Sequence, residues 1–442
     1  MKGFRVLSIF ATLTTVMACN NQEQKKEENK DKADTVATTS QQVDLPAPYA
    51  TKSSTLFCEV IGWPADKTPV APAGFTVTPY AKDLINPRNV YQAPNGDVFV
   101  VESNTEAKGI SKAEVLVSGK GKSQRMGTSA NRVTLLRDTN KDGIPDQRSV
   151  YLAGLNQPYG LLIIGNNFYV ANTDGLWRYP YSASDSIMKS PGKKIVDLPA
   201  GGYNNHWTRN IIANKDNSKI FIAVGSGSNV AEHGMENEIR RADVLQVNPD
   251  GSGEQVYASG LRNPAGITLQ PSTGNLYTVV NERDELGDDL VPDYFTSVKQ
   301  GGFYGWPYSY FGQHEDPRMK DKQRPDMVAK AIIPDVALEP HVAALGVHFY
   351  AGSSFPAKYQ NGAFIGEHGS WNRSALSGYK IVFVPFNNNK PGKPEDFITG
   401  FIADDKEHKV YGRPVNVLAL QDGSLLIADD SGNTLWKVSY KG

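Results

Sequence analysis

The sequence predicts an all-β fold, and its repeats indicate a six-bladed β-propeller. Gly (41 residues) and Pro (27) are abundant, and Tyr (20) and Phe (17) outnumber Trp (6). This composition is typical of short strands joined by tight turns. A weak repeat also runs along the chain, in which a small or polar corner precedes two apolar strands separated by an Asn, Asp or Gly turn. Because six such units occur, and four antiparallel strands fit in each, we expect six blades.

The six corners open the units in chain order. They lie at residues 86–90, 157–161, 206–210, 262–266, 344–347 and 412–416. Strands that follow the turns are expected at residues 98–101, 168–170, 220–224, 276–280 and 425–428. Two longer intervals, 107–131 and 284–340, are interpreted as insertions. The first strand of each propeller blade lines the central axis and loops at one end build the site, so we expect the chemistry at the corners.

The start of the chain is predicted to be a lipoprotein signal peptide. Lys2 and Arg5 flank the start of an apolar stretch that is too short to span a bilayer and ends in Ala18 and Cys19. A small residue directly before a cysteine is the pattern at which bacterial lipoproteins are cleaved and acylated. We therefore predict a signal peptide over residues 1–19 with a lipid on Cys19. The alternative is an ordinary signal peptide with a chance cysteine.

The chain stays polar from Asn20 to Gln42, so no core can form there. Residues 20–50 are therefore predicted to be a disordered tether, and residues 51–442 the propeller domain. The lipid predicts an exported protein anchored to a membrane. Asn20 is not the acidic residue associated with inner-membrane retention, which favours the outer membrane, at its periplasmic face or at the cell surface.

Net charge and cysteine content exclude two classes of function. The formal net charge is −1, which provides no basic field for nucleic acid. Cys58 is the only cysteine besides Cys19, so no intrachain disulfide is expected. Neither Phe57 nor Glu59 offers a basic partner, so Cys58 is interpreted as a buried apolar residue rather than a catalytic thiol.

Arginines recur at four of the corners, as Arg88, Arg209, Arg262 and Arg413. A single arginine at a strand end is usually a solvated surface residue. Several at equivalent places in a ring converge on its axis, however, and guanidinium groups bind carboxylates in a bidentate manner. The set therefore predicts a funnel for a polyanionic ligand.

His206 follows a polar, glycine-containing stretch at the third corner. A histidine titrates near neutral pH and can take a proton from a substrate hydroxyl. The alternative is a hydrogen-bonded loop histidine without a catalytic role. His341 and His368 lie in loops expected at the same end, and either could line the pocket.

Two acidic tracts indicate hard cations. Residues 138–146 place oxygens at alternate positions before a glycine, in the manner of a calcium loop, and the candidate ligands are Asp138, Asn140, Asp142 and Asp146. The alternative is an Asn/Asp-Gly turn between strands. Residues 281–289 gather several carboxylates, which is costly unless a cation or an arginine neutralises them.

Several segments resemble the soluble quinoprotein sugar dehydrogenases, and most of all their sorbosone dehydrogenase branch. They are Arg262-Asn263-Pro264 after Gly260, Asn281-Glu282 leading to Asp288-Asp289, the Gly-Gly-Phe-Tyr-Gly-Trp-Pro run at 301–307, and residues 57–64, 366–373 and 412–415. The similarity extends from about Phe57 to Val438, which is nearly the whole chain after the tether.

The resemblance implies pyrroloquinoline quinone (PQQ) and calcium on the axis of a six-bladed propeller. His206 matches the general base of the family. The residues matched to quinone contacts are Arg262, Asn263, Arg373 and Arg413, and those matched to calcium are Asp284, Glu285, Asp288 and Asp289. Of these, Asp284 and Glu285 stand where backbone carbonyls hold the catalytic calcium, and Asp288 and Asp289 resemble a further calcium-binding pair.

Two positions depart from the glucose-oxidising members of that family. Val415 stands where they carry a second arginine, and Asp284-Glu285 where they have Gly-Pro. These departures speak against transferring their exact cofactor contacts, or glucose as substrate, to this chain.

The expected function is PQQ-dependent oxidation of an aldose or a sorbosone-like sugar aldehyde by hydride transfer to the quinone. The chain has no Cys-x-x-Cys-His haem motif, so electrons are expected to pass to an external cytochrome or quinone. Two alternatives use the same fold: a calcium-dependent lactonase or esterase, and a non-catalytic sugar-binding propeller.

Overall fold

The computed structural model describes residues 43–106, 112–124 and 126–442. The chain divides into two units, Met1–Thr38 and Thr39–Gly442, and all described residues belong to the second. Cys19, the signal peptide and most of the predicted tether lie outside the described residues. No helix in the described part of the chain combines the length and the apolar content needed to cross a bilayer.

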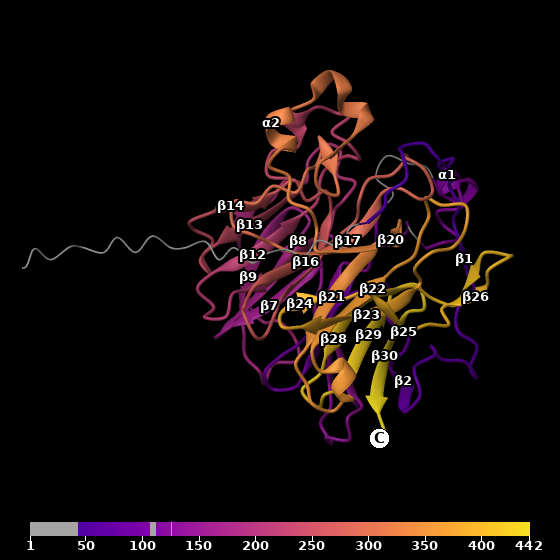
Figure 1. The fold of residues 1–442 in the computed structure, drawn as a ribbon. Helices are drawn as coiled ribbons and strands as arrows, with labels where there is room; N and C mark the ends of the chain where they lie inside the picture. Colours follow the sequence, from indigo (N-terminus) through magenta and orange to yellow (C-terminus); the bar gives the residue numbers. More distant parts are fainter. Residues whose placement is uncertain (1–42, 107–111, 125) are drawn as a thin grey trace, which may run out of the picture. The chain divides into compact units, whose positions relative to one another are not determined.

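The second unit is nearly all-β, and most of its strands belong to antiparallel sheets of four or five strands (Figure 1). The first sheet consists of β3 (Pro87–Gln92), β4 (Val98–Glu102), β5 (Arg132–Arg137) and β6 (Gln147–Leu152). The second consists of β7 (Gly160–Ile164), β8 (Asn167–Asn172), β9 (Gly175–Pro180) and β10 (Lys193–Asp197). The third consists of β11 (Arg209–Ala213), β12 (Ile220–Val224), β13 (Asp243–Val247) and β14 (Gln255–Ser259).

The later sheets follow the same order of strands. The fourth consists of β15 (Pro264–Leu269), β16 (Leu276–Val280), β17 (Pro292–Ser297) and β20 (Val336–Pro340). The fifth consists of β21 (Ala344–Tyr350), β22 (Gly362–Glu367) and β23 (Lys380–Asn387), with β24 (Lys390–Pro391) and β25 (Glu395–Ile398) both paired to β23. The last consists of β28 (Pro414–Ala419), β29 (Leu425–Asp429), β30 (Thr434–Tyr440) and β2 (Phe75–Ala81).

The sheets close into a ring. The first strands contact one another in the order β3, β7, β11, β15, β21 and β28, and β28 contacts β3. Buried apolar clusters fill the space between each sheet and the next, and another cluster joins the last sheet to the first through Leu426 and Val98. The last sheet takes β2 from the start of the unit, with Phe75 opposite Tyr440. This arrangement is a β-propeller, and the polar corners before the first strands therefore meet at one end of the axis.

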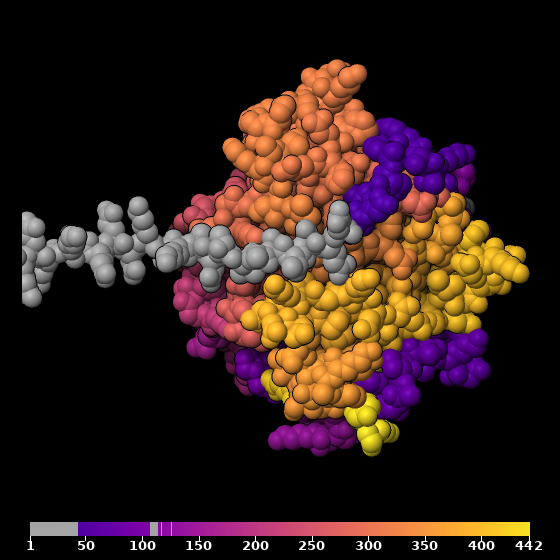
Figure 2. All heavy atoms as spheres, viewed as in Figure 1, coloured from indigo at the N-terminus to yellow at the C-terminus, as the bar shows by residue number. Residues whose placement is uncertain are grey.

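The remaining elements are short. They are β1 (Glu59–Val60), β26 (Ile402–Asp404) and β27 (Lys409–Val410) in one small sheet, the hairpin of β18 (Ser309–Tyr310) and β19 (His314–Glu315), helices α1 (Lys112–Val117) and α2 (Pro325–Val328), and the 3-10 helices η1 (Met235–Asn237), η2 (Pro317–Lys322) and η3 (Ala357–Tyr359). In Figure 2 the orange atoms of the segment that carries η2 and α2 gather at the top of the view.

The structure corrects the extent of one predicted insertion. Residues 284–340 include β17 and β20, which both belong to the fourth sheet, so the inserted segment runs only from Val298 to Asp335. The sequence obscured this because β17 follows the acidic tract directly. Residues 43–50, at the end of the predicted tether, contact the domain: Val43 and Leu45 pack against the cluster between the third and fourth sheets.

Candidate active site

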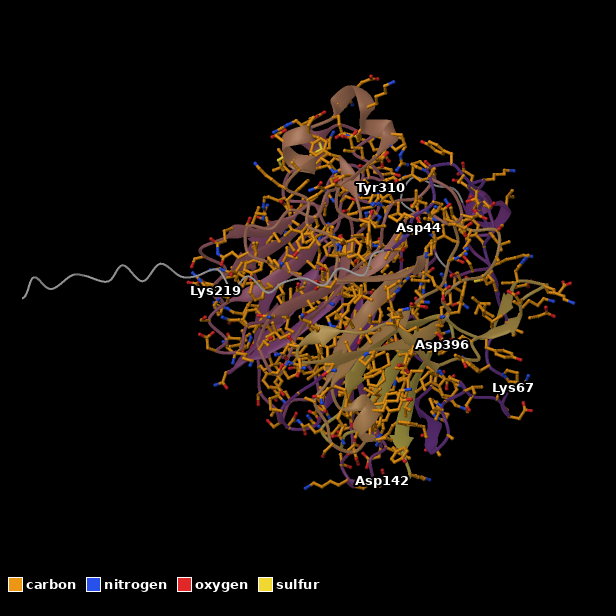
Figure 3. All side chains as sticks on the ribbon, viewed as in Figure 1. Asp44, Lys67, Asp142, Lys219, Tyr310 and Asp396 are labelled. Atoms are coloured by element: carbon orange, nitrogen blue, oxygen red, sulfur yellow. The ribbon has the colours of Figure 1, made fainter. Side chains whose placement is uncertain are left out.

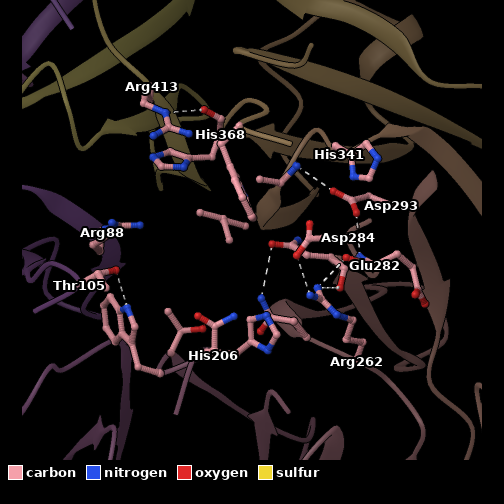
Figure 4. A pocket seen from close by; sticks show the side chains of 18 residues that line it. Arg88, Thr105, His206, Arg262, Glu282, Asp284, Asp293, His341, His368 and Arg413 are labelled. Carbon is pink, nitrogen blue, oxygen red and sulfur yellow. Dashed lines mark hydrogen bonds and ion pairs between the residues drawn. The ribbon is translucent and has the colours of Figure 1, made fainter. Parts of the chain in front are cut away.

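An inner cavity of about 150 Å³ lies at the axial end of the first strands (Figure 4). Its wall is formed by residues just before the first strands, residues just after the second strands, and neighbouring loops. The lining residues are Arg88, Thr105, Asn205, His206, Trp207, Thr208, Arg262, Asn263, Asn281, Glu282, Asp284, Asp293, His341, Ala343, Leu345, His368, Trp371 and Arg413. The repeat thus brings residues far apart in the sequence to one place.

One side of the inner cavity is cationic. Arg413 is buried, and its Nε and Nη2 donate to the carbonyl oxygens of His368 (3.0 Å) and Gly369 (2.9 Å). Arg88 pairs with Asp430, with 3.1 Å between Nε and Oδ2. The same carboxylate accepts from Nε2 of His368 at 3.0 Å. Burial and Arg413 lower the pKa of His368 to about 3, so this histidine is neutral and the two guanidinium groups carry the charge.

The opposite side of the cavity carries several carboxylate, amide and carbonyl oxygen atoms (Figure 4). Arg262 holds this side together: its Nη2 pairs with Asp284 at 3.0 Å, and its Nη1 donates to the carbonyl of Glu282 at 2.6 Å. Glu282 Oε1 and Asn263 Oδ1 are both buried, and neither has a hydrogen-bond partner among the described residues. Two buried acceptors without a donor indicate that this side is built to receive a ligand.

Asp293 closes the floor of the oxygen-rich side. Its two carboxylate oxygens accept from the backbone N–H groups of Glu282 (2.8 Å) and Ala343 (2.7 Å). Burial nevertheless raises the pKa of Asp293 to about 7. His341 is held nearby by a 2.9 Å hydrogen bond between its Nε2 and the carbonyl oxygen of Gly287.

His206 lies between the two sides of the inner cavity (Figure 4). Its Nδ1 is 2.9 Å from the carbonyl oxygen of Ser226. A carbonyl oxygen can only accept, so Nδ1 carries the proton and Nε2 is the unprotonated nitrogen. Burial, followed by the charge of Arg262, lowers the pKa of His206 well below its usual value. His206 is therefore neutral at physiological pH and able to accept a proton.

An outer cavity of about 610 Å³ adjoins the inner one, and the two share Asn205, Asp284 and Trp371. The inserted segment supplies part of its wall through η2. Arg318 of η2 pairs with Asp316 at 2.8 Å and donates to the carbonyl of Asp284 at 2.9 Å. The insertion is therefore fixed to the acidic tract at residues 281–289. The outer cavity gives a small molecule a path to the inner one.

A family model with the description "Domain of unknown function (DUF7133)" matches residues 67–429. The chain belongs to this family. It is also similar to an uncharacterized protein of Borreliella burgdorferi, with 31% identity over 67% of this chain and 80% of that protein.

Two further relatives have named activities. One is the pyrroloquinoline quinone-dependent pyranose dehydrogenase of Coprinopsis cinerea, with 24% identity over 72% of this chain; the match spans only 45% of that protein. The other is the aldose sugar dehydrogenase YliI of Escherichia coli, with 26% identity over 58% of this chain and 66% of that protein. The holo structure of the Coprinopsis PQQ domain has a TM-score of 0.67 at 20% identity, covering 87% of this chain and all of that domain. It has the same propeller fold.

Most predicted site residues converge, and two arginines do not. Arg88, Arg262, Asn263 and Arg413 line the inner cavity with His206. Arg209 instead donates to carbonyls of its own approach loop, including that of Pro199 at 2.7 Å, and so has a structural role. The described residues that line the inner cavity do not include Arg373, which pairs with Asp289 at 3.0 Å; its contact with a cofactor stays a prediction.

The predicted calcium ligands lie in three places. Asp284 faces both cavities and Glu285 the outer one. Asp288 accepts from the backbone N–H groups of Ser54 and Ser374, both at 2.9 Å, and so joins three segments of the chain. No group of three or more His, Cys, Asp or Glu side chains suited to a metal ion occurs in the part of the chain that the structure describes.

The residues 138–146 form a turn between β5 and β6 in which the loop satisfies its own carboxylates. Asp138 accepts from the N–H of Gly143 at 2.7 Å, Asp142 from that of Ile144 at 2.8 Å, and Asp146 from that of Thr139 at 3.1 Å. The geometry agrees with the Asn/Asp-Gly turn, and calcium binding here stays a prediction.

Sequence reasoning missed three polar residues of the site. Asp430 directly follows β29, and the polar end of that strand was a usable signal. Asp293 lies in β17, inside a segment interpreted as an insertion. Trp207, whose Nε1 donates to Thr105 Oγ1 at 2.8 Å, lies in the third corner beside His206, and its position there was the usable signal.

Proposed function

We propose that this protein is a PQQ-dependent sugar dehydrogenase on a six-bladed propeller, oxidising an aldose or a sorbosone-like sugar aldehyde. The observation that carries the proposal is a neutral, partly buried histidine, His206, between a guanidinium-lined side and an oxygen-rich side of one cavity. The named activities of two relatives support the same chemistry. Six sheets of four or five strands support the blade count.

The residues of the inner cavity fit PQQ. The cofactor has three carboxylates; Arg88 and Arg413 would bind them through charge-assisted hydrogen bonds, and Arg262, whose N–H groups all donate within the chain, would add its positive charge. A structural observation supports this fit: Arg88 and Arg413 each keep their guanidinium buried at the cavity, at 5% and 2% exposure, with Asp430 as the carboxylate between them. A buried cationic excess of this kind favours an anionic ligand.

The oxygen-rich side fits a hard cation such as calcium, which takes carboxylate and amide oxygens. Glu282 Oε1 and Asn263 Oδ1, which are buried and accept no hydrogen bond from the described residues, would become ligands of the cation. The carboxylate of Asp284 would add negative charge. The carbonyl oxygen of Asp284 already accepts from Arg318 and Asn229, so we propose the side-chain oxygens as the donors.

The role of the chain is to hold the sugar and to move one proton. PQQ, when bound, supplies the hydride acceptor and calcium supplies a Lewis acid. Nε2 of His206 accepts the proton of the sugar hydroxyl as the hydride leaves the same carbon. The low pKa of His206 keeps Nε2 unprotonated before this step. The sugar reaches His206 from the outer cavity, past Asn205 and Trp371.

We further propose that electrons pass to an external cytochrome or quinone, and that a lipid on Cys19 holds the enzyme at the outer membrane beside that acceptor. The sequence pattern at Ala18-Cys19 supports the anchor. Growth of cells with a radiolabelled fatty acid tests it, because a Cys19→Ala variant is then expected to lose the label.

Reconstitution tests the activity. Protein lacking residues 1–19 is mixed with PQQ and calcium and assayed on a panel of sugars with an artificial electron acceptor. We expect quinone-dependent oxidation, and a His206→Ala variant that still binds PQQ but is slower by about two to four orders of magnitude. His314→Ala, an exposed histidine on β19, is the matched control. Lactone hydrolysis without quinone, and no sugar oxidation with it, would instead establish the lactonase alternative.

A further inference from the structure

A buried carboxylate, Glu238, lies behind the loop that holds His206. Ser226 is the direct partner of the ring: besides its carbonyl, its Oγ lies 3.0 Å from Nδ1 of His206. Ser226 is itself fixed, because its N–H donates to the carbonyl of Arg262 at 2.8 Å and its hydroxyl donates to the carbonyl of Ser228 at 2.6 Å. The ring of His206 thus rests on a short loop, residues 225–228.

Glu238 anchors this loop from the side away from the histidine. Its Oε2 accepts from the N–H of Gly227 at 2.7 Å, and its Oε1 accepts from the hydroxyl of Ser228. The carboxylate is only 5% exposed, and β12 and β13 hold the two segments that it joins. A buried carboxylate that accepts from both an N–H and an O–H restrains its partners strongly.

The loop has no room to adjust. A Cβ on Gly225 would lie 2.5 Å from Oδ1 of Asn263 and 2.6 Å from Cβ of His206, and a Cβ on Gly227 would lie 2.8 Å from the carbonyl oxygen of Tyr203. The glycines therefore allow the backbone to approach the base closely. A shift of the loop would be transmitted directly to the ring.

The hydrogen bonds also have one direction only. An ionised carboxylate cannot donate, so the Ser228 hydroxyl must donate to Glu238. The Ser228 carbonyl then accepts from the Ser226 hydroxyl, which leaves Ser226 O and Oγ as acceptors for Nδ1–H of His206. The carbonyl oxygen and the hydroxyl oxygen of Ser226 fix the proton on Nδ1, and Glu238 holds the loop that carries both acceptors.

We propose that Glu238 is a positioning residue: it holds the loop 225–228, and so keeps the Ser226 acceptors where they set the tautomer and the orientation of His206. It touches neither the cavity nor the ring. Its effect on turnover rests on the proposed function, whereas its effect on the tautomer of His206 does not.

The tautomer is measured first, in the full chain without any cofactor. Ring ¹⁵N chemical shifts of labelled histidine report which nitrogen carries the proton, and the signal of His206 is the one missing from His206→Ala. We expect a single Nδ1–H tautomer in the wild type. In Glu238→Gln the amide cannot accept at both of its atoms, so we expect mixed or exchange-broadened tautomers. Glu236→Gln, the same change on an exposed side chain two residues away, should leave the signal unchanged.

Turnover is measured next, in the PQQ-loaded protein. We expect Glu238→Gln to lower kcat by about tenfold with KM within about twofold, because the base is misplaced while the binding groups remain. If Glu238→Gln does not fold, Ser228→Ala, which removes only the hydroxyl that donates to Glu238, decides in its place. A folded Glu238→Gln or Ser228→Ala protein with the wild-type tautomer would overturn the proposal. Absence of turnover in the wild type would count against the proposed function alone.

Discussion

Two acidic tracts of similar composition have very different surroundings. In the tract at 138–146, here the surface tract, the carboxylates accept hydrogen bonds from their own backbone. In the tract at 281–289, here the axial tract, they pair with arginines, accept hydrogen bonds from distant segments or line a cavity. In Figure 3 Asp142 lies at the lower edge, far from Tyr310 of the insertion. The difference teaches that the place of a tract in the topology, rather than its oxygen content, decides whether its side chains reach a cavity.

The largest expected effect comes from Arg283, the buried cation of the axial tract. Arg283 pairs with Glu282 at 2.9 Å and with Asp316 at 3.2 Å, and all three side chains are fully buried. Arg283→Met leaves the buried carboxylate of Glu282 without its cation, whereas Asp316 keeps Arg318, and the change is expected to cost about 3–5 kcal/mol of unfolding free energy. Urea denaturation measures this loss. Arg324→Met, which breaks an exposed pair with Asp326, is the matched control and should change little.

The next effect concerns Asp284, which links the axial tract to the base. Its charge raises the pKa of His206 against burial and Arg262. Asp284→Asn is therefore expected to make His206 a weaker base and to lower kcat/KM by about tenfold at neutral pH. A pH–rate profile should show its acid limb at lower pH than in the wild type. An unchanged acid limb would remove Asp284 from the electrostatics of the base.

Asp293, in the strand that follows the tract 281–289, and Asp146, in the tract 138–146, should differ in pH dependence. Burial raises the pKa of Asp293 to about 7, so its contribution to stability is complete below its ordinary pKa near 4 and is lost as the pH rises through 7. Hydrogen bonds from Thr139 lower the pKa of Asp146, so that contribution is present above pH 4 and is lost only in acid. Between about pH 6.5 and 8, the unfolding free energy of Asp293→Asn should fall less steeply than that of the wild type. The unfolding free energy of Asp146→Asn should fall as steeply as that of the wild type.

The smallest effect is expected in the surface tract. Asp142→Asn removes one charge from a turn that is otherwise held by several backbone hydrogen bonds. We expect unchanged activity and a change in Tm of about 1 °C. A calcium-dependent rise of Tm in the wild type that disappears in Asp142→Asn would contradict this expectation and would establish the tract as a calcium loop.

Corner residues of the site were predictable from the sequence because the repeat gives their place. His206, Arg262 and Arg413 precede first strands and meet at the axis for that reason. Arg209 has an equivalent position in the sequence, yet its guanidinium turns back to its own loop. Side-chain direction after a strand depends on local acceptors, which the repeat does not encode.

Contacts between distant segments were beyond sequence reasoning. The pairing of Asp430 with Arg88 and His368 joins the last sheet to the first and fifth, and no local pattern marks it. Asp293 was hidden because β17 follows the acidic tract directly. Residues whose role depends on the closing of the ring can only be found once the ring is known.

The sheet that holds both β2 and β30 has a consequence for how the protein is made. A chain that emerges with its amino end first presents β2 early, but β2 finds its partner only when Thr434–Tyr440 has followed. The ring therefore stays open until the last strand has been made, and the arginines and the histidine of the inner cavity come together only then.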